Sequence, residues 1–340
     1  MGDEWRSIGG AAWRLDAGDA LRCSGDAAPT PGDRHKDQTR LDHVVAGRGL
    51  TLPTFKEMTA LMTSADETQH ADPDRFQLAG VEAPQELVNS VIRLLARHRS
   101  IRDYRPEPLP DGLLEVLVTA AQSASTSSNL QMYSIIAVRD PEKKRLLAEW
   151  SDNPFAAQAP LILVFCPDLH RLEMVSRRQG YDFIDRDMEM FIQAVVDTAL
   201  AGQNTAIAAE SLGLGICYLG GIRNQVAKVA ELLRLPPRTF ALFGMAIGYP
   251  ARPSRVRHRL PMDVVLHHEA YSDDRLEEGL RRYDAVTAAS GIYSGRHIPL
   301  PQAKEPQVYG WSEHTARRMA RPNPNRRNMR QQLEALGWEF

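Results

Sequence analysis

Apolar residues recur at helical spacing in the first strongly patterned part of the chain. In "PQELVNSVIRLLARH", one stripe behind a proline start is formed by Leu87, Val91, Leu94 and Leu95. This spacing is typical of an amphipathic helix. A second helix is predicted over "DGLLEVLVTAAQSA", with Asp111 as its N-cap, because a short acidic side chain can accept hydrogen bonds from the first helical turn.

Several short apolar runs between turn signals predict strands. "MYSIIAVRD" reads as a strand that ends at Asp140, followed by a short helix over "PEKKRLLAEW". The nearly continuous apolar run "APLILVFCP" predicts a strand buried on both faces. "ICYLGG" and "TFALFGMAIGYP" predict two more strands, separated by the amphipathic helix "NQVAKVAELLRL".

The longest predicted helix covers residues 187–212, where many alanines and one glycine favour close packing at the centre of the fold. Gly213 and Gly215 end it. Strands and helices alternate through residues 84–250. This alternation predicts an α/β or α+β domain with helices on both faces of a sheet.

The first 80 residues differ from the rest. "DAAPTPGDRHKDQTRLDH" is polar, contains proline and has no hydrophobic period. Such a composition buries little apolar surface and predicts a solvated or partly disordered extension.

Composition narrows the function classes. The chain has 340 residues, 43% of them hydrophobic, and a formal net charge of −2, which is typical of a soluble globular protein and argues against general nucleic-acid binding. The sequence contains neither an apolar run of about 20 residues for a membrane span nor the apolar core of a secretory signal. The three cysteines form no CxxC pair, so we expect a reducing cytoplasm rather than a disulfide scaffold.

Two arginine-rich stretches carry the clearest candidate chemistry. "HRSIRDYRP" follows a predicted helix, and its cations either complement the helix end or collect donors for an anion. In "RVRHRLP", the alternating Arg255, Arg257 and Arg259 would point to one side of an extended chain. A solvated basic loop is the favoured reading of that stretch taken alone. There is no GxGxxG after the first strand and no GxxxxGK[ST], so a phosphate here would be held by side chains.

Two further stretches leave alternatives open. "SASTSSNLQ" is rich in residues that favour turns, but it is longer than a turn requires. In "YLGGIRN", Gly220 and Gly221 either permit a positive φ or let a flat ligand approach the backbone. The adjacent His267 and His268 have no spaced carboxylate partner, and we interpret them as a solvated strand end rather than a metal site.

Taken together, "HRSIR", "STSSNLQ", "AAESLGLGICYLGGIRN" and "RHRLP" resemble, in order and spacing, the FMN-dependent nitroreductases. The likeness is to the oxygen-insensitive NADPH nitroreductases and NADPH–flavin oxidoreductases. It covers about residues 86–272 and continues more loosely to the C-terminus. It implies an α+β fold, a three-layer α-β-α sandwich around a central mixed sheet, in an intertwined homodimer with FMN at the subunit interface. We therefore divide the chain into an extension, 1–82, and an FMN domain, 83–340, whose residues from about 273 to 340 form a C-terminal extension for the dimer and the substrate site.

The resemblance also implies which side chains meet the cofactor and the substrate. The expected FMN contacts belong to the HRSIR element, the serine-rich stretch, the glycine turn and a phosphate clamp: His98, Arg99, Ser100, Arg102, Thr126, Ser128, Gln131, Asn153, Leu219, Gly220, Gly221, Arg257 and Arg259. Arg102 is also the expected catalytic residue, facing the reacting side of the flavin. The expected substrate contacts are Asn129, Tyr218 and Arg296.

Some positions depart from the family pattern. Arg257 stands where lysine is common, and its wider fork still neutralises a phosphate. Asn153 replaces a longer glutamine, and Asn129 replaces an aromatic residue. Residues 294–310 are longer and richer in proline than the family's basic loop for the NADPH 2′-phosphate. NADPH rather than NADH is thus expected from the resemblance alone.

The sequence therefore predicts a homodimeric FMN oxidoreductase that transfers two electrons from NADPH or NADH to a nitroaromatic, a quinone or a free flavin in alternating half-reactions. Neither nucleic acid nor a membrane is an expected partner, and residues 1–82 are expected to be dispensable for flavin binding. Two alternatives stay open. One is a flavin reductase that feeds a partner monooxygenase, and the other is a flavin-binding or sensing protein with little turnover.

Overall fold

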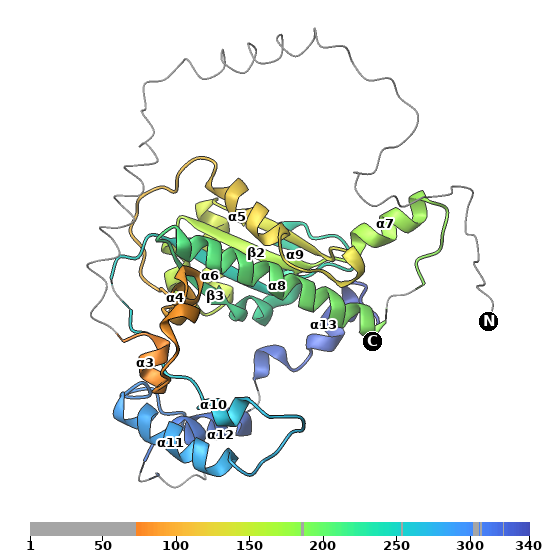
Figure 1. The fold of residues 1–340 in the computed structure, drawn as a ribbon. Helices are drawn as coiled ribbons and strands as arrows, with labels where there is room; N and C mark the ends of the chain where they lie inside the picture. Colours follow the sequence, from red (N-terminus) through yellow and green to blue (C-terminus); the bar gives the residue numbers. More distant parts are fainter. Residues whose placement is uncertain (1–72, 185–186, 253, 302–305, 307, 322) are drawn as a thin grey trace, which may run out of the picture. The chain divides into compact units, whose positions relative to one another are not determined.

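The computed structural model describes residues 73–340 apart from 185–186, 253, 302–305, 307 and 322. Its centre is a four-stranded sheet in the order β1 (Tyr133–Val138), β2 (Leu161–Pro167), β4 (Phe243–Gly248) and β3 (Gly215–Leu219) (Figure 1). Neighbouring strands pair antiparallel. We expected a mixed sheet, but its four strands are antiparallel. A parallel contact to the sheet is made by the isolated bridge between Ser100 and Ile216.

The strand β2 is the core of the sheet. All seven of its residues are buried, as the continuous apolar run predicted. Because side chains alternate across a strand, β2 contributes to two separate apolar clusters. One contains Leu161, Leu163 and Phe165, and the other contains Ile162, Val164 and Cys166.

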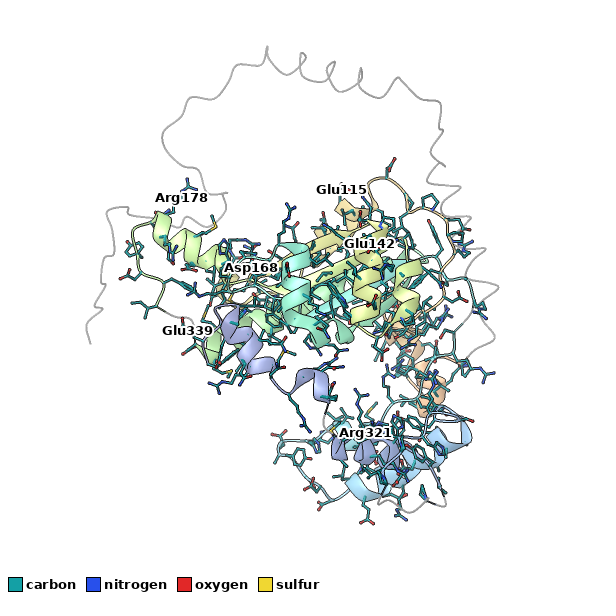
Figure 2. The ribbon with its side chains drawn as sticks, turned by 180° about the vertical axis from the view of Figure 1, so that it is seen from behind. Glu115, Glu142, Asp168, Arg178, Arg321 and Glu339 are labelled. Carbon is teal, nitrogen blue, oxygen red and sulfur yellow. The ribbon has the colours of Figure 1, made fainter. Side chains whose placement is uncertain are left out.

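Helices cover both faces of this sheet. The cluster around Phe165 is completed by α5 (Leu113–Gln122) and α8 (Met188–Ser211). The opposite cluster is completed by α6 (Pro141–Trp150) and α9 (Val226–Leu233). In Figure 1, α8 lies in front of the strands, and in Figure 2, seen from behind, the helix with Glu142 does. The three-layer α-β-α sandwich is thus confirmed.

The helix α8 agrees with its prediction to within a residue. It begins after Asp187, whose side chain accepts hydrogen bonds from the N–H groups of Glu189 and Met190, and the chain turns at Gly213 with a φ of +74°. Its single glycine marks a close approach to the sheet. A Cβ at Gly202 would lie 2.6 Å from the Phe243 ring, so a larger residue would push the helix away from β4.

Two helix predictions require correction. The helix expected over 84–98 is divided into a short 3₁₀ turn, η1 (Gln85–Leu87), and α4 (Ser90–Ala96). The division falls at Asn89, whose side chain accepts a hydrogen bond from the N–H of Ile92 and starts a new helix. The expected N-cap Asp111 is also wrong, because α5 begins after Gly112, which has a φ of +80°.

The apolar stripe of that first segment is exposed rather than packed in the core. Leu87, Val91 and Leu95 are 65%, 54% and 41% exposed, whereas Val88 and Ala96 are buried. Amphipathic spacing shows that a helix has an apolar face, but it does not show whether the same chain covers that face.

A helix also lies within the segment that we assigned to the N-terminal extension. Residues Arg75–Ala79 form α3, which is capped reciprocally by Asp74 and Gln77 and ends at Gly80 with a φ of +63°. Five residues are too few to show an apolar period, so the sequence pattern missed this helix. The predicted disorder of residues 1–72 lies outside the described residues.

The remaining elements connect the layers and form the C-terminal part. They are η2 (Ser127–Asn129), η3 (Pro154–Gln158), α7 (His170–Arg178), η4 (Gly220–Gln225), α10 (Met262–Val265), α11 (Leu276–Ala289), α12 (Trp311–Ala320), η5 (Pro324–Arg326) and α13 (Met329–Ala335). Among the residues with described positions, no helix has the length and apolar character that crossing a membrane requires.

Candidate functional site

The HRSIR segment is held against β3 by backbone contacts. The N–H of Ile101 donates to the Ile216 carbonyl over 2.8 Å, and Ser100 forms a parallel bridge with Ile216. The side chain of Ile101 packs directly over Gly215, where a Cβ would come within 2.5 Å of it. The glycine of "GLGICYLGG" at 215 therefore lets the HRSIR segment approach the strand.

The second arginine stretch is brought to the same place by chain pairing. The N–H of Arg105 donates to the Tyr249 carbonyl over 2.9 Å, and the N–H of Ala251 donates to the Asp103 carbonyl over 3.0 Å. The hydroxyl of Ser254 donates to the Ser100 carbonyl over 3.4 Å. These contacts run the end of β4 alongside HRSIR, so "RVRHRLP" emerges beside it.

Between the two stretches lies a cavity of 330 Å³ with a strongly cationic lining. Its lining residues are His98, Arg99, Ser100, Arg102, Ser254, Arg255, Arg257, Arg259, Ile292, Tyr293, Arg296 and His314, among which there is no carboxylate. Burial lowers the pKa of Arg257, and the charges of Arg296 and Arg102 lower it further. Gathered like charges raise the energy of the site, and an anion in the cavity would offset this cost. All six cationic or hydroxyl side chains predicted for HRSIR and the phosphate clamp meet here.

Neighbouring residues orient the HRSIR side chains. The Nδ1 of His98 lies 2.7 Å from the Oε1 of Glu210, near the end of α8. The Nη1 of Arg99 donates to the Arg97 carbonyl over 3.0 Å. The guanidinium of Arg102 lies 6.0 Å from the centre of the Phe155 ring, within the range of a cation–π contact.

The serine-rich stretch lies elsewhere, and its backbone is strained. Ser128, Asn129 and Gln131 have φ values of 48°, 56° and 52°, in the left-handed region that side chains with a Cβ rarely adopt. Asp197 of α8, only 1% exposed, holds both ends of the loop. Its carboxylate accepts hydrogen bonds from the N–H of Ser127 (2.9 Å) and the N–H of Met132 (3.2 Å).

Sequence reasoning missed Asp197. A signal was present, because an acidic residue at the centre of an alanine-rich helix has to be paired if it is buried. The sequence pattern could not identify the partner of Asp197, because that partner is a backbone segment more than sixty residues earlier in the chain.

One chain does not bring the two halves of the predicted flavin site together. The loop with Thr126 and Ser128 is tied to Asp197, whereas His98 is tied to Glu210. These two anchors are thirteen residues apart on α8, which is about 20 Å along a helix that rises 1.5 Å per residue. Thr126, Ser128, Asn129 and Gln131 accordingly do not line the cavity.

One of the two paired glycines, Gly221, has a packing role. A Cβ at Gly221 would lie 1.9 Å from the carbonyl oxygen of Ser151, which also accepts a hydrogen bond from the Nδ2 of Asn153 over 2.6 Å. The carbonyl of Gly220 accepts a hydrogen bond from the Nη2 of Arg326 over 3.0 Å. Neither glycine has a positive φ. Close backbone approach explains Gly221, whereas a Cβ at Gly220 would meet only the Arg223 guanidinium at 3.6 Å. Leu219 before them is buried.

The predicted substrate residues are separated from one another. Arg296 lines the cavity, but Tyr218 packs 5.1 Å from the Phe243 ring on the sheet, where burial and the charge of Glu210 raise its pKa. Sequence reasoning missed four cavity residues, Ser254, Ile292, Tyr293 and His314. The rings of the last two stack at 4.2 Å. Burial, followed by the charges of Arg318 and His297, lowers the pKa of His314.

This fold and this cavity together define a class: α+β sandwiches that hold an anionic ligand beside the edge of the sheet. Comparison with protein families makes the class specific. The model of the "Nitroreductase family" matches residues 95–249, and that of the "Nitroreductase family, C-terminal domain" matches residues 257–340. The chain belongs to the nitroreductase family.

Individual relatives agree with this assignment. An FMN reductase (NADPH) of Bacillus subtilis is 43% identical over 202 residues, which are 58% of this chain and 81% of the relative. An oxygen-insensitive NADPH nitroreductase of Salmonella typhimurium is 36% identical over 254 residues, 74% of this chain and 99% of the relative. The solved structure of B. megaterium NfrA1 is 36% identical, has a TM-score of 0.67 and matches 74% of this chain and 100% of its own.

Proposed function

We propose that this protein is an FMN-dependent oxidoreductase that takes electrons from NADPH or NADH and passes them to a small oxidant such as a nitroaromatic, a quinone or a flavin. The observation that carries the proposal is the arginine-lined cavity between HRSIR and "RVRHRLP". The names of the relatives, an FMN reductase (NADPH) and an NADPH nitroreductase, support the same electron donor and cofactor.

The residues of the cavity fit the phosphate end of FMN. Guanidinium groups form charge-assisted, bidentate hydrogen bonds with phosphate oxygens, and Arg99, Arg257 and Arg259 line one continuous cavity. A terminal phosphate suits such a clamp, whereas the pyrophosphate of FAD is commonly held by a glycine-rich fingerprint that this sequence lacks. We therefore assign FMN, with Arg99, Arg257 and Arg259 on its phosphate.

When bound, FMN would supply the two-electron hydride chemistry between NAD(P)H and the oxidant. The chain's own part is to fix the ring and to set its electrostatics. Arg102 is held beside Phe155 and close enough to Arg257 for its charge to lower the pKa of that residue. A fixed cation at the ring end of the clamp favours negative charge that develops during reduction, and this is the catalytic role that we give to Arg102.

The active form, we propose, is a homodimer in which each site is completed by the partner copy. The helix α8 carries an exposed apolar line at four-residue spacing, Met188, Ile192, Val196 and Leu200, each between 42% and 49% exposed. The helix α4 packs on α8 and carries the exposed Val91 and Leu95, and the exposed Leu87 lies in the preceding turn η1. A two-fold contact would bury both apolar faces and would let the loop with Thr126 and Ser128 reach the partner's cavity.

Complementation between two inactive variants tests this arrangement. Arg259→Ala damages the cavity and Asp197→Ala damages the loop, so homodimers of either variant should bind FMN weakly. If each site combines the cavity of one copy with the loop of the other, a mixed dimer contains one site with both parts intact. Denaturing and refolding an equal mixture should then restore part of the FMN binding. No restoration would mean that cavity and loop act within one chain.

The direct test of the proposed function is the cofactor. The purified protein should show an oxidised flavin spectrum that NADPH bleaches, and the extracted flavin should be FMN; mainly FAD would refute the assignment. Arg259→Ala removes a charge-assisted contact worth about 1.5–3 kcal/mol and should weaken FMN retention at least tenfold. The free, buried thiols of Cys166 and Cys217 suit the reducing cytoplasm that we propose as its location.

A further inference from the structure

The helix α3 lies before the residues matched by the family model, which begins at residue 95, yet one of its side chains reaches the HRSIR segment. The Nη2 of Arg75 donates a hydrogen bond to the carbonyl oxygen of His98 over 3.2 Å. This carbonyl belongs to the first residue of HRSIR. In Figure 1, α3 lies between α4 and the helices α10 and α11.

A second nitrogen of the Arg75 guanidinium has no partner in the protein. Its Nε is buried and has no hydrogen-bond partner. Leaving a buried donor unpaired is unfavourable, and more so for a charged group. Native proteins rarely keep such a donor unless a ligand or water meets it.

Arg75 is not among the residues that line the cavity, but it lies within electrostatic range of Arg259 in the phosphate clamp. Burial lowers the pKa of Arg75, and the charge of Arg259 lowers it further. The charges of Arg259 and Arg75 also act on the hydroxyl of Tyr283 in α11, and this hydroxyl donates to the His258 carbonyl over 3.2 Å. Two guanidinium groups held near each other repel, and an anion between them would offset both the repulsion and the unpaired Nε.

We propose that Arg75 is an additional anchor for the FMN phosphate, supplied by a helix outside the family domain. The inference rests on the proposed function, because the anion it assigns is the phosphate of that cofactor. Arg75 has two tasks: its Nη2 fixes the start of HRSIR, and its charge adds to that of Arg259. A purely structural role would consist of the first task alone.

FMN and riboflavin separate the two roles, since they share the ring and differ in the phosphate. Apoprotein of the full chain would be titrated with each flavin by fluorescence quenching, as wild type, Arg75→Gln, Arg75→Lys and the control Arg93→Gln. Arg93 is a fair control because it is an exposed arginine of the neighbouring α4, hydrogen-bonded to Gln85. Thermal unfolding followed by circular dichroism would report the folding of every variant.

We expect Arg75→Gln to weaken FMN binding at least tenfold and riboflavin binding less than twofold, with a weaker salt dependence for FMN. Arg75→Lys should recover part of the loss, and Arg93→Gln should behave as wild type. Equal weakening of both flavins, or unchanged FMN affinity, would overturn the role of Arg75 while FMN binding by the wild type still supports the proposed function. A wild-type protein that binds neither flavin would overturn both. If Arg75→Gln does not fold, the FMN-to-riboflavin ratio of Arg75→Lys decides.

Discussion

Replacing Asp197 by alanine tests whether the flavin-site loop is held in place by one buried carboxylate. The carboxylate accepts two hydrogen bonds from backbone N–H groups, one from Ser127 and one from Met132. Hydrogen bonds to a charged group contribute about 1.5–3 kcal/mol each. The Met132 bond is buried, and we count the partly buried Ser127 bond at the lower end of that range, which gives a loss of about 3–4 kcal/mol.

Relaxation of the loop returns part of this loss. Ser128, Asn129 and Gln131 have positive φ values, each of which is unfavourable by roughly 1–2 kcal/mol for an L-residue. We expect the loop to release one of the three, which returns about 1 kcal/mol. The net decrease in the free energy of unfolding should then be about 2–3 kcal/mol. For a folded region of this size, that corresponds to a decrease in Tm of roughly 4–10 °C.

The assay is thermal unfolding of the apoprotein, followed by FMN titration at 20 °C. Thr198→Val is the matched control, because Thr198 is also fully buried on α8 but its hydroxyl bonds only to Ala194 of the same helix. Asp197→Asn keeps one acceptor oxygen and should fall between wild type and alanine. A Tm for Asp197→Ala within 2 °C of that of Thr198→Val, with unchanged FMN affinity, would refute the reasoning.

Four further outcomes are expected. Arg102→Ala should keep FMN bound but lower kcat/KM by ten- to a hundredfold, about 1.4–2.7 kcal/mol; normal rates in stopped-flow reduction and reoxidation would remove its catalytic role. Val196→Glu on α8 should give monomers in size-exclusion chromatography with weak FMN binding, whereas Val116→Glu on α5, equally exposed, should stay dimeric. A chain that begins at residue 73 should bind FMN as the full chain does. A chain that begins at residue 83 lacks Arg75 and should bind FMN about tenfold more weakly. Equal FMN affinities would support the expectation that residues 1–82 are dispensable. The pKa of His314 in the folded state lies below its unfolded value, so the folded state binds fewer protons. Its stability therefore falls as the pH falls through about 6.5 toward the folded pKa. In unfolding curves between pH 5 and 8, His314→Asn should flatten this loss of stability.

The sequence by itself determined the elements whose pattern is local. Seven consecutive apolar residues predicted β2 as a strand buried on both faces, and the pattern over residues 187–212 predicted α8 to within a residue at each end. Burial of a strand or one face of a helix leaves a period in the chain, so these elements can be read without their neighbours. The distinctive motifs also led to the family, which the matches over residues 95–249 and 257–340 confirm.

Only the tertiary structure decided which distant segments of the chain lie in contact. The cavity depends on backbone hydrogen bonds between segments roughly 150 residues apart in the chain, and the need for glycine at position 221 depends on the Ser151 carbonyl. The role that we propose for Arg75 depends on the charge of Arg259. The exposed stripe of Leu87, Val91 and Leu95 has the same period as a core helix, because the period records an apolar face and not what covers it. Contacts between distant segments leave no periodic signal in either segment, and the site of this protein is made almost entirely of such contacts.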